Sequence, residues 1–193
     1  MSLRTTFLAA TAVLALGACS RGNDATQAGT TNGSDLGATG MATATPTAAA
    51  PASAGQRFAD TAAASDAFEI ETSRLALATS TSPAIKRYAQ AMIDAHEAST
   101  AKLKTVAAGL SPAIQPVATL SPEQQQTVES LRAAKGTAFD RAYAAAQAAA
   151  HQQTLDALKA YATGGDVPPL KTFAQDLVPT VTAHLNMAKG LKV

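Results

Sequence analysis

The sequence is poor in the features that mark several large protein classes. Its single cysteine, Cys19, excludes a disulfide within one chain. Positive charge is not in excess, since there are 15 basic and 14 acidic side chains, and no basic patch with interleaved aromatic residues suggests nucleic-acid binding. No glycine-rich phosphate loop and no nucleophile-elbow motif occurs. The sequence therefore predicts no nucleic-acid partner and no catalytic residue.

The sequence also lacks the alternation of β-branched residues that is typical of strands, whereas alanine, the best helix former, is frequent. Four helices are expected, at residues 57–79, 82–108, 121–163 and 168–189. The second and third begin with Ser-Pro, a cap followed by a first-turn proline. A break near Gly136 is an alternative within the third, and Pro179 is expected to kink or split the fourth. Short connections imply an all-α, antiparallel four-helix bundle.

Residues 1–18 have the three parts of an export signal. Arg4 supplies a positive charge, residues 7–16 are apolar but too few to span a bilayer, and small residues follow. Leu-Gly-Ala-Cys at residues 16–19 resembles a bacterial lipobox, in which the cysteine is lipidated and becomes the mature N-terminus. An ordinary secretory signal and a soluble periplasmic protein is the alternative.

Ser20, in place of an aspartate after the cysteine, favours the outer membrane over the inner one, by analogy with bacterial lipoprotein sorting. We expect the protein to face the periplasm and to contact the membrane through its N-terminal lipid. Residues 19–55 contain almost no large apolar side chain. Such a segment cannot offset the entropy of ordering, so it is expected to be a disordered linker to a domain at residues 56–193.

The chain has three histidines, His96, His151 and His184, and each is expected on the inward face of a different helix. In an up-down-up-down bundle the first and third turns lie at one end. Counted from that end, Glu69 and the three histidines are 12 to 16 residues away, roughly 18–24 Å at about 1.5 Å per residue. We expect these four side chains to share one layer.

Three imidazoles and one carboxylate in one layer have the composition of a metal site. The expected ligands are therefore Glu69, His96, His151 and His184. Asp140, Tyr143 and Met92 are expected around this site and not among its ligands. Asp140 lies three helical turns from His151, too far along the axis to bind the same ion. The alternative is a purely structural layer in which the histidines pair with acidic and hydroxyl side chains. Burial and mutual repulsion predict lowered histidine pKa values, unless a carboxylate pairs with one of them.

Several short motifs resemble a known family. They are Glu-Ile at residues 69–70, Met-Ile-x-x-His at 92–96, Phe-Asp-x-x-Tyr at 139–143 and His-Leu at 184–185. The sequence resembles the domain-of-unknown-function 4142 family, exported bacterial proteins with a ferritin-like bundle that are often labelled predicted outer membrane proteins. The resemblance points to Glu69, His96, Asp140, His151 and His184. It implies the fold and the compartment, but no established activity.

The chain departs from the Glu-x-x-His pattern of ferritin-like di-iron proteins. The residues three positions before the histidines are Ile93, Ala148 and Val181. One zinc, copper or iron ion is therefore expected rather than a di-iron centre. A thioether from Met92 or Met187 would favour copper(I), although methionines at helical spacing are more often core residues.

Three functions remain open from the sequence. The leading one is a non-catalytic, lipid-anchored envelope protein that binds a transition metal. The second is an envelope interaction or spacer module of unknown protein partner. The third, a metal-dependent oxidase or hydrolase, needs an open coordination position, which no sequence feature indicates.

Replacement of the lipobox cysteine tests the expected location. In Cys19→Ala, lipidation should be lost and the protein should be released into the periplasm as a soluble species. Fractionation of cells and mass spectrometry of the N-terminus measure both outcomes. A variant that still fractionates with membranes as the parent does would contradict the lipid anchor.

Overall fold

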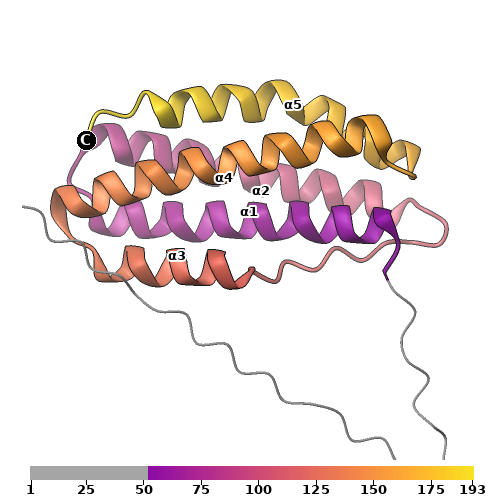
Figure 1. Cartoon of the computed structure of the whole chain (residues 1–193), viewed down its shortest axis with the longest axis horizontal. Helices are drawn as coiled ribbons and strands as arrows, with labels where there is room; N and C mark the ends of the chain where they lie inside the picture. Colours follow the sequence, from indigo (N-terminus) through magenta and orange to yellow (C-terminus); the bar gives the residue numbers. More distant parts are fainter. Residues whose placement is uncertain (1–51) are drawn as a thin grey trace, which may run out of the picture. The chain divides into compact units, whose positions relative to one another are not determined.

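The computed structural model describes residues 52–193, so the expected export signal, Cys19 and residues 20–51 of the expected linker lie outside the described residues. The described part contains five helices and no strand, which confirms the all-α prediction. The helices are Ala54–Thr79 (α1), Pro83–Ala108 (α2), Pro122–Ala133 (α3), Gly136–Gly164 (α4) and Pro168–Lys189 (α5). Four of them, α1, α2, α4 and α5, form a bundle, and the short α3 packs against α1 (Figure 1). None of these five helices is both long and apolar enough to cross a membrane.

Serine side chains cap the N-termini of three helices. Ser53, Ser82 and Ser121 each accept a backbone N–H from the residue three positions ahead. Ser121 and Gln124 cap each other reciprocally. Helix α1 starts a few residues earlier than expected because Ser53 supplies its cap. Helix α5 continues through Pro179 as one helix rather than splitting there.

The predicted third helix over residues 121–163 is two helices in the structure. Helix α3 ends at Ala133, and Ala134 and Lys135 are extended. Gly136 begins α4 with a φ of 56°, in the left-handed region where only glycine avoids a steric penalty. The chain reverses at this point, so that α4 runs back past α3 (Figure 1).

This reversal corrects the predicted chain order within the bundle. The rings of Tyr88 and Tyr143 are 6.1 Å apart and those of His96 and His151 are 5.6 Å apart. Both pairs are separated by 55 residues, so α2 and α4 run parallel. The expected up-down-up-down order is therefore wrong, and the α1–α2 and α4–α5 turns lie at opposite ends (Figure 1). Helix α3 belongs to a crossover connection like the one in ferritin-like bundles, where directly packed helices remain antiparallel.

The bundle interior has two apolar clusters, one towards each end. The first includes Phe58 and Leu103, and the second includes Ile85 and Phe139. On α2, His96 lies between Ile85 of one cluster and Leu103 of the other. A polar layer therefore crosses the core near the middle of the helices.

Candidate metal centre

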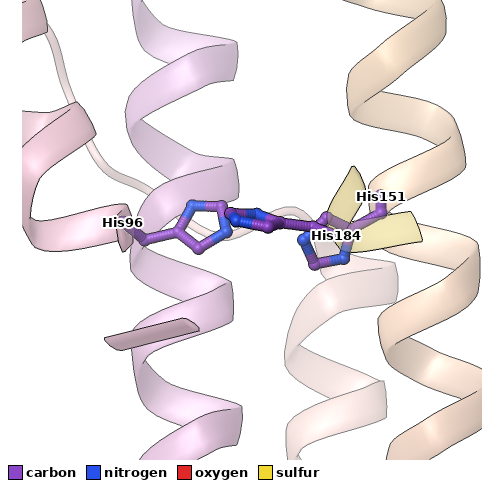
Figure 2. A group of neighbouring side chains, drawn as sticks. All are labelled: His96, His151 and His184. Carbon is purple, nitrogen blue, oxygen red and sulfur yellow. The ribbon is translucent and has the colours of Figure 1, made fainter. Parts of the chain in front are cut away.

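The three histidines meet in this central layer. His96 projects from α2, His151 from α4 and His184 from α5, and their rings point toward one another (Figure 2). The ring centroids are 5.4–5.8 Å apart. One nitrogen from each ring lies within 4.8 Å of the other two. The structure thus brings together every imidazole of the chain.

The shared height survives the corrected topology because His96 and His151 lie near the middle of their helices. His96 is 13 residues from the start of α2, and His151 is 15 residues from the start of α4. Parallel helices that begin at the same end place these residues at similar heights, about 20 and 22 Å along the bundle at about 1.5 Å per residue. The residue count from the ends therefore gave the right layer from a wrong chain order.

His96 is held by an acidic side chain of α1. Its Nδ1 lies 2.8 Å from Oδ1 of Asp66, and Thr100 donates to the other carboxylate oxygen at 3.0 Å. A carboxylate only accepts hydrogen bonds, so the imidazole Nδ1 donates the proton. Nε2 of a neutral His96 then carries a lone pair that points away from Asp66.

His151 is oriented by its own helix. Its Nδ1 donates to the backbone carbonyl of Gln147 at 2.8 Å, which again leaves the lone pair on Nε2. Among the described residues, no hydrogen-bond partner reaches His96 Nε2, His151 Nε2 or His184 Nδ1, all of which are buried. A buried acceptor without a partner costs about 1–3 kcal/mol. Three such nitrogens in one layer suit a cation.

The donor set fits a first-row transition metal. At a metal–nitrogen distance of about 2.0–2.1 Å, tetrahedral ligands lie about 3.4 Å apart. One nitrogen of each ring lies within 4.8 Å of the other two. To reach the tetrahedral separation, these nitrogens would need to move closer to one another by about an ångström. Three imidazoles also leave one tetrahedral position for a further ligand.

Glu69 lies beside the histidines but not among the three converging nitrogens. It is 1% exposed, and its Oε1 is 3.5 Å from His151 Nδ1. This is the ring nitrogen opposite to the one that carries the lone pair. The group of possible ligand atoms contains the three histidines without Glu69. Glu69 therefore contacts His151, one of the candidate ligands. Coordination of a metal by Glu69 itself stays a prediction.

The three residues expected around the site are buried, but they lie farther along the bundle. Tyr143 shares a 2.8 Å hydrogen bond with the hydroxyl of Ser73, and Met92 packs in the apolar cluster around Ile85. Asp140 is 7% exposed and lies eleven residues before His151. The alternative thioether, Met187, is 44% exposed, unlike an inward ligand.

Comparison with known proteins identifies the family. Residues 40–191 match the family model described as a domain of unknown function, DUF4142. The chain belongs to the DUF4142 family. No curated protein matches this chain closely enough to be counted as a relative.

Two solved structures share the fold of this DUF4142 protein. They are described as CopM in the Cu(II)-bound form and CopM in the Cu(I)-bound form, with TM-scores of 0.60 and 0.58. Each is 18% identical, and the match covers 70% of this chain and 93% of that chain. At this identity the likeness establishes the helical bundle alone.

Asp66 is the site residue that the sequence prediction missed. It is 5% exposed and holds His96. It lies three residues before Glu69, so the two acidic residues share a face of α1. Residue spacing does not show its hydrogen bond to His96, which joins two helices.

The environment of the site shifts the pKa values of its titrating groups in different directions. Burial raises the pKa of Glu69 to about 7, against a smaller lowering effect of His96. Burial lowers the pKa values of His151 and His184 to about 4, and the charge of His96 adds to this. Burial also acts to lower the pKa of His96, but the hydrogen bond to Asp66 and the nearby Glu69 raise it overall. The expected lowering of the pKa holds for His151 and His184, and His96 is the expected exception, because a carboxylate pairs with it.

The pH dependence of stability follows from these shifts. His151 and His184 have folded pKa values below the ordinary 6.5, so their contribution is present above pH 6.5 and is lost on acidification towards pH 4. Between pH 7.5 and 5.5 this removes roughly 1 kcal/mol per histidine. Glu69, raised from 4.5 to about 7, acts oppositely, since its contribution is present at low pH and is lost as the pH rises through 7. It restores roughly 2 kcal/mol on the same acidification.

We therefore expect the free energy of unfolding of the metal-free protein to change by less than about 1 kcal/mol between pH 7.5 and 5.5. In Glu69→Gln the contribution of Glu69 is absent, so the loss on acidification should exceed that of the parent by roughly 2 kcal/mol, while the raised pKa of His96 opposes the loss in both proteins. In His151→Gln the loss of stability on acidification should vanish or become a gain. Urea denaturation at both pH values measures all three proteins. The same pH response in all of them would show that these groups are not buried together.

Proposed function

We propose that this DUF4142 protein is a lipid-anchored, periplasm-facing protein that binds one transition-metal ion through His96, His151 and His184. Two observations carry the proposal: one nitrogen of each ring lies within 4.8 Å of the other two, and each ring has a buried nitrogen with no hydrogen-bond partner among the described residues. Hydrogen bonds to Asp66 and to the Gln147 carbonyl fix two of the rings. Such partners of the distal ring nitrogen are typical of metal-binding histidines.

Copper is the metal that we propose. Imidazole nitrogens bind zinc, copper and iron, and copper(II) stands highest in the order of affinity for divalent first-row metals. The copper-bound forms of CopM have the same type of bundle, which supports copper over zinc or iron. Two carboxyl groups, Asp66 and Glu69, lie against the histidines and would balance the charge of a divalent ion on three neutral imidazoles.

The envelope location rests on the N-terminal sequence. The expected export signal and the lipobox ending in Cys19 support anchorage in the outer membrane, with a soluble periplasmic form as the alternative. The linker would then let the metal-binding bundle stand away from the membrane surface.

Metal binding is tested by titration with copper(II) in a Cys19→Ala background, which removes the only thiol of the chain. We expect one copper per chain with a dissociation constant below micromolar. Removal of two of three imidazoles in His96→Ala, His151→Ala should weaken binding by roughly 100-fold or more, about 2.7 kcal/mol. Isothermal calorimetry and metal analysis of the same samples measure this.

Gln152→Ala is the matched control, because Gln152 is exposed beside His151 on α4. Its copper affinity should equal that of the parent. No binding tighter than micromolar by the parent, or unchanged binding by the double histidine variant, would end the metal proposal.

A second candidate is an envelope interaction module whose polar layer only fixes the register of the helices. A groove of about 790 Å³ favours it. The groove runs over α1, α3 and α4, and its lining includes Phe58, Phe68, Val117, Ala149 and Leu158. An apolar groove of this size is typical of a site that a partner covers.

Site-specific cross-linking in intact cells tests this candidate. A photoreactive residue at Ala149, in the groove, should give a defined adduct with an envelope protein. The same residue at Ala98, exposed on α2, should give none. Equal labelling at both positions, or no envelope partner at either, would count against an interaction module.

A further inference from the structure

A small cavity adjoins the histidine group. Its volume is about 30 Å³, and His96 and His184 form part of its wall. A cavity needs about 10–15 Å³ of such space to hold one water molecule. There is therefore room for one or two molecules of water size directly beside two of the three histidines.

At the seam between α2 and α5, the cavity is lined by residues that solvent reaches. Its wall there includes Ser99, which is half-buried, and Thr180, which is exposed. His184 is half-buried, whereas His96 and His151 are only 5% and 1% exposed. Helices α2 and α5 also pack against each other less extensively than α1 does on α2 or α4 on α5. This seam is thus the direct path from solvent to the histidine layer.

The opposite side of the cavity is closed by a hydrogen bond. Thr154 lines the cavity from α4, and its hydroxyl lies 2.7 Å from the hydroxyl of Ser65 on α1. Ser65 is itself 8% exposed. This bond joins α1 to α4 between the cavity and the larger apolar groove, which both residues also line.

The backbone of α5 is weakened next to the mouth of the cavity. Pro179 directly precedes Thr180 inside the helix. Proline has no N–H, so the carbonyl of Gln175 loses its helical partner. A local outward movement of α5 at this point breaks one backbone hydrogen bond fewer than elsewhere in the helix.

We propose that the α2–α5 seam is the route by which the metal ion enters and leaves, and that the cavity holds one small monodentate ligand of the metal, of the class of water, halide or azide. This inference rests on the proposed function. Three protein ligands with a solvent molecule in the fourth position form an open type of metal site. Ser99 and Thr180 at the mouth then control the rate of exchange, while the histidines set the affinity.

The test separates rate from affinity in the copper(II)-loaded full chain carrying Cys19→Ala. Azide, which gives a charge-transfer absorption on binding copper(II), reports access to the fourth position by stopped-flow. Transfer of copper to a chelator reports exit. In Ser99→Leu, Thr180→Leu both rates should fall roughly tenfold or more, with the copper dissociation constant within about threefold of the parent. Ala98→Leu, on an exposed position of α2 outside the cavity, should exchange as the parent does.

Two further variants keep the route falsifiable. Ser99→Ala, Thr180→Ala widens the mouth and should speed exchange even if the leucine variant folds poorly. Ser65→Ala breaks the bond to Thr154 at a residue outside the cavity wall and should leave the rates unchanged. Parental rates in the leucine or alanine variant, or faster exchange in Ser65→Ala, would overturn the route. Failure of the parent to bind copper would overturn the proposed function as well, whereas normal binding with unaltered exchange overturns the route alone.

Discussion

The architecture of this domain centres on three imidazole nitrogens that are buried without a hydrogen-bond partner among the described residues. Leaving each of them unpaired costs about 1–3 kcal/mol, in a domain whose whole stability is of the order of 5–15 kcal/mol. The surrounding residues maintain this arrangement rather than relieve it. Asp66 and the Gln147 carbonyl take up the opposite nitrogens of two rings. The two apolar clusters pack above and below the layer. A bound cation would use all three nitrogens at once.

The helices of the bundle could be read from the sequence because their signals are local. Ser82 and Ser121 act as caps that depend only on the next three residues, and alanine-rich segments have few alternatives to the helix. The chain order could not be read in the same way. It depends on Gly136 adopting a positive φ, and a glycine within a helical pattern is equally compatible with continuation. One residue therefore decides whether α4 runs with or against α2.

The histidine layer was predictable for a different reason. His96 and His151 lie near the middle of their helices, so their heights agree whichever end of the bundle is used for counting, and His184 is counted from the turn that joins α4 to α5. Asp66 was not predicted, because its role depends on a side-chain contact between α1 and α2 that periodicity alone does not give. The raised pKa of His96 follows from that contact, with a further contribution from Glu69. The position of Glu69 on the Nδ1 side of His151 likewise depends on side-chain conformation, which residue spacing does not determine.

The most direct test of the account is a crystal structure of the copper-loaded protein with an anomalous difference map at the copper absorption edge. We expect one peak per chain, bonded at about 2.0 Å to His96 Nε2, His151 Nε2 and His184 Nδ1. A peak elsewhere in a fully loaded protein would contradict it. A histidine layer without copper, in which these three nitrogens form hydrogen bonds instead, would also contradict it.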